Sequence, residues 1–286
     1  MPEARPEVVR ACPLGCAETG CALGTLERTA GFALSRDSYT LSRCGCGALL
    51  YLSPAPSDSD LRAMYVDHGQ FGEEYTDEKR VAAILEYIGG CFDRMVSSRQ
   101  WRGPIRVLEV GAGLAWMCRA AKSRGAANVT VAQDLSPEAA QACPWVDDYV
   151  VGTLDDARVA SRGPYHVISM THVIEHLVDP VSVLAQCRGL IAPDGIVFVT
   201  APHRPRDWRE GDMDAWRRYS YNHVPAHIQY FAQGSMKRLA DATGFGVAYW
   251  SHAHESGEAF EAWLSPSPVA VKPLSWWKRI ARTLGA

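Results

Sequence analysis

The stretch Val107-Leu108-Glu109-Val110-Gly111-Ala112-Gly113-Leu114-Ala115 decides the fold. Its mostly apolar first half is typical of a short buried strand, and a helical pattern follows it. The two glycines allow a tight turn and a close approach to a ligand, because they carry no Cβ. The N–H groups at the start of the following helix would face the same ligand. We therefore expect a nucleoside-binding turn between a strand and a helix.

Around this turn, apolar strand patterns alternate with helical ones. The expected strands are 105–110, 129–133, 149–151, 165–170, 195–200 and 247–251. The expected helices are 58–66, 77–98, 114–123, 137–142, 180–191 and 234–243. Such alternation predicts an α/β fold, a doubly wound, mostly parallel sheet with helices on both faces. No final antiparallel strand is evident after Ser251.

Asp134 ends the second expected strand, 21 residues after Gly113. A carboxylate at this place can accept both hydroxyls of a ribose. The dinucleotide fingerprint has a small residue three positions after its second glycine, where this chain has Trp116. An NAD-dependent oxidoreductase is therefore only a remote alternative. Glu109, directly before the turn, suits a positively charged group such as an amino acid ammonium.

Further motifs point to one family. Residues 109–113 resemble the first motif of class I S-adenosylmethionine (SAM) dependent methyltransferases, and residues 165–180, 194–202 and 227–231 resemble later motifs of their ubiquinone-biosynthesis-like branch. The resemblance covers about residues 100–250. It implies a SAM-binding, Rossmann-like domain that transfers a methyl group to an oxygen, nitrogen or carbon nucleophile of a small molecule, in the biosynthesis of a specialised metabolite or cofactor precursor. Aminocarboxypropyl transfer and cyclisation are the alternative uses of SAM.

The resemblance also implies which residues bind SAM. Near the methionine and sulfonium end it places Glu109, Gly111, Gly113, Thr171 and His172. Near the ribose and adenine it places Asp134, Leu135, Thr153 and Leu154. Tyr75, ahead of the main domain, would close over SAM. Ala115 stands where the longer motif has a third glycine.

The N-terminal part of the chain holds five of the nine cysteines. Two close pairs, Cys12 with Cys16 and Cys44 with Cys46, could each direct two thiolates at one ion, and four thiolates form a closed structural Zn²⁺ site. The segment is similar to the N-terminal zinc ribbon of some small-molecule methyltransferases. Both pairs depart from the usual two-residue gap, and Cys21 is a substitute ligand. The alternative is a degenerate ribbon whose cysteines are buried as small apolar groups.

Four residues are candidates for the group that removes a proton from the methyl acceptor. His176 follows the fourth strand of the parallel sheet and His203 follows the fifth, so both lie at the edge where such folds bind ligands. His227 and Tyr230 lie in the segment 203–233, an insertion expected to cover the substrate. Each could instead be a packed structural residue. A metal site made of two histidines and one acid is a minor alternative, because no metal-binding spacing stands out.

Composition sets the remaining expectations. The 286 residues carry a formal charge of −3 without a long basic run, which favours a small-molecule or protein substrate over nucleic acid, and we expect a small molecule. Neither a signal peptide nor a membrane span is evident, so we expect a cytoplasmic monomer or homodimer without stable membrane association. The expected domains are a Cys-rich module (1–56), a helical linker or lid (57–100), a SAM-binding domain (101–265) and a C-terminal tail (266–286).

Overall fold

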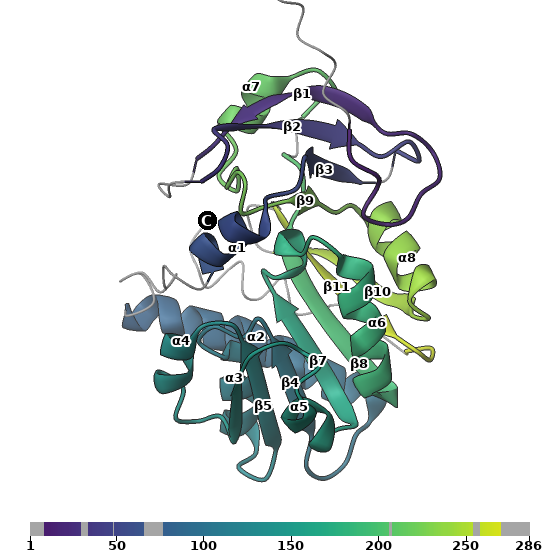
Figure 1. The fold of residues 1–286 in the computed structure, drawn as a ribbon. Helices are drawn as coiled ribbons and strands as arrows, with labels where there is room; N and C mark the ends of the chain where they lie inside the picture. Colours follow the sequence, from purple (N-terminus) through teal and green to yellow (C-terminus); the bar gives the residue numbers. More distant parts are fainter. Residues whose placement is uncertain are drawn as a thin grey trace, which may run out of the picture.

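Two β-sheets organise the chain in the computed structural model (Figure 1). The structure describes residues 9–29, 34–47, 49–65, 77–205, 208–253 and 258–269. The larger sheet contains β4 (Arg106–Val110), β5 (Val129–Asp134), β6 (Asp148–Val151), β7 (Tyr165–Thr171), β8 (Ile191–Pro202), β10 (Gly246–Ala253) and β11 (Ala259–Ser265). Its strand order is β10-β11-β8-β7-β4-β5-β6, and the strands from β8 to β6 run parallel. The predicted doubly wound α/β fold is confirmed.

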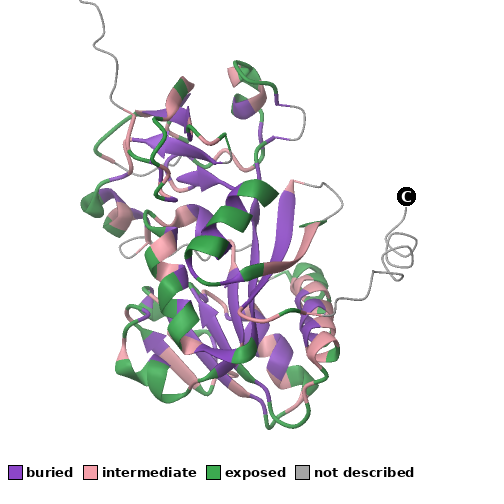
Figure 2. Cartoon of the chain, turned by 90° about the vertical axis from the view of Figure 1, so that its right-hand side faces the viewer, coloured by how far each residue is buried: buried purple, intermediate pink, exposed green. Residues whose placement is uncertain are grey.

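Helices cover both faces of this sheet. They are α2 (Glu78–Arg99), α3 (Trp116–Arg124), α4 (Pro137–Gln141), α5 (Ala157–Ser161), α6 (Pro180–Leu190) and α8 (Gln233–Ala242). Successive side chains of a strand point to opposite faces. Val107 therefore packs with α2 and α3, whereas Leu108 packs in the core that contains residues of α5, α6 and α8. The buried sheet between the two helical layers is visible in Figure 2.

An antiparallel strand, β11, completes the larger sheet between β10 and β8. The sequence did not reveal it, because all seven of its residues are buried and the usual polar alternation is absent. Glu261 lies on this strand with 1% of its surface exposed. Its carboxylate accepts two hydrogen bonds from Arg94 of α2, at 2.6 and 2.8 Å. The ion pair allows a carboxylate to occupy a buried strand.

The smaller sheet joins the N-terminal module to the insertion 203–233. It consists of β1 (Cys21–Glu27), β2 (Ser38–Arg43), β3 (Leu50–Ser53) and β9 (Gln229–Tyr230), all antiparallel. Strands β2 and β3 pair from Thr40 with Ser53 to Arg43 with Leu50. Strand β9 belongs to the insertion, as does α7 (Met213–Arg217), and Trp216 and Tyr230 pack with Leu41 in one core. The module and the insertion therefore share a sheet and a core.

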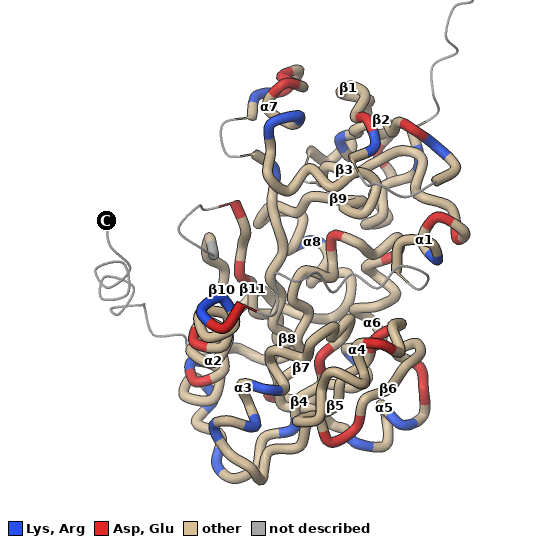
Figure 3. The backbone as a smooth tube through the Cα atoms, turned by 90° about the vertical axis from the view of Figure 1, so that its left-hand side faces the viewer, with Lys and Arg blue, Asp and Glu red and all other residues tan. Residues whose placement is uncertain are grey.

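Charges of both signs are interspersed over the two sheets and their connections (Figure 3). In the part of the chain that the structure describes, no helix combines the length and apolar character that crossing a membrane requires. The final 17 residues of the predicted tail, 270–286, lie outside the described residues.

Candidate active site

The glycine turn lies at the carboxyl end of β4. Three of its residues have positive φ angles: Gly111 (57°), Gly113 (49°) and Ala115 (52°). A Cβ built on Gly111 would lie 2.8 Å from a methyl carbon of Val173, so the turn and the end of β7 are in close contact. Ala115 takes up a left-handed conformation at the position where the family motif has glycine, and α3 begins directly after it.

Asp134 faces this turn from the end of the neighbouring strand, β5. Its Oδ2 accepts a hydrogen bond from the Gly113 N–H at 2.8 Å, and its Oδ1 accepts one from the Ser136 N–H at 2.9 Å. Leu135 follows with 44% of its surface exposed, whereas most large apolar side chains among the described residues are covered. An acid at the mouth of the turn beside an uncovered leucine suits a ribose and the face of an adenine.

Glu109 is buried beneath the turn. Its two carboxylate oxygens accept hydrogen bonds from the backbone N–H groups of Met117 (3.2 Å) and Cys118 (3.0 Å), at the start of α3. Burial is the largest influence on this carboxyl and raises its pKa to about 7, although the two N–H groups act in the opposite direction. The sequence suggested a ligand-facing acid, but did not indicate that it also caps a helix. The carboxylate satisfies N–H groups that Ala115, at the N-cap, leaves without a side-chain partner.

The other predicted adenine and sulfonium contacts lie at the same edge of the sheet. Thr153 and Leu154 follow β6, and the Gly152 N–H beside them donates to the Asp134 carbonyl at 2.9 Å. Thr153 is exposed, whereas Leu154 is buried in the core. Thr171 ends β7. The next residue, His172, has a φ of 54° and donates its N–H to the Thr200 carbonyl at 2.8 Å.

A cluster of ionisable side chains follows β7 in the short helix η2 (Ile174–His176). Glu175 has no exposed surface, and its Oε1 lies 3.3 Å from His172 Nδ1 and 3.9 Å from His176 Nε2. His227, from the insertion, packs against His176 with ring centroids 4.9 Å apart. Burial acts to raise the pKa of Glu175, whereas the neighbouring imidazoles lower it to about 2. The structure thus brings His176 and His227 together next to Glu175, which was not among the predicted site residues.

The remaining catalytic candidates lie apart from this arrangement or in the core. His203 directly follows β8; its Nδ1 donates to the Arg204 carbonyl at 2.6 Å and its ring packs edge-on against His252. Tyr230 is buried against Trp216, and its hydroxyl has no hydrogen-bond partner among the described residues. Tyr75 lies outside the described residues. Tyr65, the last residue of α1 (Asp58–Tyr65), instead places its hydroxyl 2.8 Å from His176 Nδ1.

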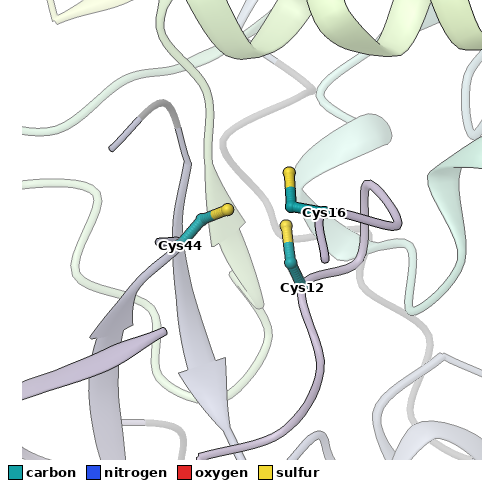
Figure 4. A group of neighbouring side chains, drawn as sticks. All are labelled: Cys12, Cys16 and Cys44. Carbon is teal, nitrogen blue, oxygen red and sulfur yellow. The ribbon is translucent and has the colours of Figure 1, made fainter. Parts of the chain in front are cut away.

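The N-terminal cysteines form a second cluster (Figure 4). The sulfur atoms of Cys12, Cys16 and Cys44 lie within 4.8 Å of one another. The Cys46 sulfur lies 3.3 Å from that of Cys16 and 2.9 Å from that of Cys44. Cys21, considered as a substitute ligand, begins β1 and is not one of the three clustered sulfurs. Four converging thiols are a donor set that fits Zn²⁺.

The fold and the turn define a nucleoside-binding, Rossmann-like enzyme domain. The chain belongs to the family described as "Methyltransferase domain", whose profile matches residues 76–249, more than half of the sequence. It is therefore a SAM-dependent methyltransferase. This assignment favours methyl transfer over a nicotinamide oxidoreductase and over the other uses of SAM.

Several known proteins are similar to this chain. A ubiquinone biosynthesis O-methyltransferase of Xylella fastidiosa is 29% identical over 201 residues, which cover 58% of this chain and 81% of that protein. One of Vibrio campbellii is 34% identical over 56 residues, covering 20% of this chain and 24% of that protein. The chain spans about a quarter to a half of the length of the first curated relatives that it matches. The plantazolicin methyltransferase BamL, solved with SAH, has a TM-score of 0.50 at 11% identity over 70% of this chain and 88% of that chain, and therefore shares the fold.

Proposed function

We propose that this enzyme methylates a hydroxyl oxygen of a small organic molecule. The observation that carries the proposal is the contact between Glu175 and His172 at the tip of β7, next to the strand that holds the glycine turn. A carboxylate at one imidazole nitrogen orients the ring and leaves the other nitrogen to accept a proton. The His172 side chain is 37% exposed, so an acceptor can reach it. The similarity to a protein named as an O-methyltransferase supports oxygen as the nucleophile.

The predicted SAM contacts form the nucleoside half of the proposed site. Asp134 would hold the ribose hydroxyls, Leu135 would cover the adenine, and Thr153 and Leu154 would border it. Gly111 and Gly113, with Glu109 below them, would surround the methionine part. Thr171 and His172 would border the sulfonium. When bound, SAM supplies a methyl group already activated for displacement.

The reaction then needs only an aligned acceptor and a place for its proton. The acceptor oxygen forms a bond to the methyl carbon while the bond between carbon and sulfur breaks. The sulfur keeps the electron pair, giving S-adenosylhomocysteine (SAH), and the hydroxyl proton passes to His172. Tyr221, whose ring stacks on His172 at 5.9 Å between centroids, would form a wall of the acceptor pocket. His203 and Tyr230 remain further candidates for acceptor contacts.

We also propose that Cys12, Cys16, Cys44 and Cys46 hold a structural Zn²⁺ ion. Its chemistry would be confined to folding the module, because four thiolates leave no open position for a substrate. Zinc analysis of the purified protein by plasma mass spectrometry should find about one equivalent. Cys44→Ser should lose it, whereas Cys187→Ser, in a buried site on α6, should retain it. Equal zinc in both variants would contradict the assignment.

A labelled-methyl assay tests the proposed reaction. The protein is incubated with SAM carrying a deuterated methyl group and with a panel of hydroxylated, amine-bearing and carbon-acid small molecules. We expect a labelled methyl ether and SAH by mass spectrometry. His172→Ala should abolish turnover, and Asp134→Ala should lose SAH affinity. Label only on nitrogen or carbon would refute oxygen methylation, and methylthioadenosine in place of SAH would refute methyl transfer itself.

A further inference from the structure

Two polar side chains behind the glycine turn share one acceptor, the carbonyl of Gly113. The Tyr149 hydroxyl donates to this carbonyl at 2.8 Å, and the Cys143 thiol donates to it at 3.6 Å. Tyr149 lies on β6, and Cys143 lies in the connection between α4 and β6. Neither residue is among the predicted SAM contacts, yet both reach the turn that would receive the ligand.

Both backbone polar groups of Gly113 are thereby bonded to side chains. Its N–H donates to Asp134 Oδ2 at 2.8 Å, and its carbonyl accepts from Tyr149 and Cys143. Gly113 has a φ of 49°, in the left-handed region. The peptide groups on either side of this residue cannot rotate without breaking a hydrogen bond and leaving a covered polar group without a partner. The conformation of the turn is therefore fixed from two directions.

The direction of the Gly113 carbonyl also determines where the next N–H points. In a planar trans peptide the C=O of one residue and the N–H of the next point in opposite directions. Since the carbonyl is directed at Tyr149, the Leu114 N–H points away from it, and this N–H has no hydrogen-bond partner among the described residues. An N–H left unbonded just before a helix suits a negatively charged group. A rotated peptide would present a carbonyl oxygen there and repel a carboxylate.

Both side chains keep the proton that they donate. Burial raises the pKa of Tyr149 far above its ordinary value, and the nearby Asp134 carboxylate raises it further. Burial likewise raises the pKa of the Cys143 thiol to about 11. Tyr149 and Cys143 are therefore protonated at neutral pH, and each can act as a hydrogen-bond donor.

We propose that Tyr149 and Cys143 are positioning residues that hold the peptide after Gly113 in the orientation that receives the methionine carboxylate of SAM. This inference rests on the proposed placement of the methionine part beside Gly111 and Gly113. The two side chains act through the peptide and do not touch SAM. Their removal should weaken ligands that carry the carboxylate and should leave ligands without it unaffected.

Two compounds related to SAM separate these effects. SAH carries the amino acid carboxylate, whereas methylthioadenosine lacks it, and calorimetry on the full chain gives the affinity of each. Tyr149→Phe should weaken SAH binding about three- to tenfold, as expected for one hydrogen bond, and should leave the affinity for methylthioadenosine unchanged. In the labelled-methyl assay, the KM for SAM should rise by the same factor while kcat keeps its wild-type value.

Tyr165→Phe is the matched control. The Tyr165 hydroxyl donates to the Val159 carbonyl at 2.5 Å, so this variant also loses a bond between a tyrosine and a carbonyl, but away from the turn. It should bind SAH as the wild type does. Cys143→Ala should have a small effect, because a thiol is a weak donor. Added to Tyr149→Phe, it should weaken SAH binding by more than the product of the two single effects, because the Gly113 carbonyl then loses both donors.

Urea denaturation shows whether each variant is folded. An unchanged SAH affinity in Tyr149→Phe, or an equal loss of affinity for SAH and methylthioadenosine, would overturn the positioning role. The same conclusion would follow if Tyr165→Phe weakened SAH binding as much as Tyr149→Phe. Failure of the wild-type chain to bind SAH would contradict the proposed SAM site itself, so the two failures are distinguishable.

Discussion

Replacing Gly111 by alanine tests the geometry of the SAM turn. The new methyl group would lie 2.8 and 3.1 Å from the two methyl carbons of Val173, on a backbone with a φ of 57°. The positive φ alone costs an L-residue about 1–2 kcal/mol. Overpacking against Val173 adds about 1–3 kcal/mol. We expect Gly111→Ala to lower the free energy of unfolding by about 2–5 kcal/mol.

Gly103→Ala provides the matched control. Gly103 has a φ of 80°, but a Cβ there would meet no atom within 4 Å. It should therefore show only the backbone cost, about 1–2 kcal/mol. Combining Gly111→Ala with Val173→Ala should recover most of the overpacking cost, and a double-mutant cycle isolates this coupling.

Urea denaturation followed by circular dichroism gives the stabilities, and calorimetry gives the SAH affinities. Gly111→Ala should weaken SAH binding by about tenfold or more, because its methyl group tightens the turn that receives the ligand. Gly103→Ala should bind SAH as the wild type does. Equal destabilisation by the two alanines, or the absence of coupling between positions 111 and 173, would refute this description of the turn.

Three further predictions concern stability. Ala115→Gly should raise the free energy of unfolding by up to about 1 kcal/mol in urea, because it removes left-handed strain at a φ of 52°, and an unchanged value would contradict that strain. The pKa of Glu109 is about 7 in the folded chain against an ordinary 4.5, so its stabilising contribution is complete below about pH 4.5 and is lost as the pH rises through 7. That loss is about 3 kcal/mol, and Glu109→Gln should flatten this part of the pH profile of unfolding; an unaltered profile would exclude the buried titration. Arg94→Met should cost about 3–5 kcal/mol by leaving Glu261 buried without its partner, and adding Glu261→Leu should restore much of it; a loss that persists in the double variant would assign Arg94 a packing role instead.

Local patterns were sufficient to predict the parallel part of the fold. Strands such as β4 and β7 are short and mostly apolar, and α2 carries an apolar face of helical period, so each element is recognisable within its own residues. The glycine turn and Asp134 were similarly identifiable, because both follow directly from the ends of predicted strands. Helix α5 was not predicted; unlike α4, which is equally short, it does not begin with a proline.

Contacts between distant segments could not be predicted in this way. The pairing of β3 with β9 joins residues about 180 positions apart, and two-residue β9 has no recognisable strand signal. Glu175 was undervalued for the same reason. Its importance comes from burial beside His227, which depends on where the insertion folds back rather than on any local spacing.

The short pairing between β3 and β9 ties the cysteine module to the histidine cluster. The Leu52 N–H donates to the Ile228 carbonyl, and the Ile228 N–H donates to the Glu175 carbonyl, each at 2.8 Å. The Gln229 amide donates to two further carbonyls around η2. Oxidation of the module's thiols would thus loosen the backbone that carries Glu175. The glycine turn after β4 would be unaffected, because it is held by hydrogen bonds to Asp134 and Glu109. We expect oxidation of these cysteines to stop methyl transfer at oxidant concentrations that still permit SAH binding. The redox state of the cysteine module would then control the acceptor half of the active site.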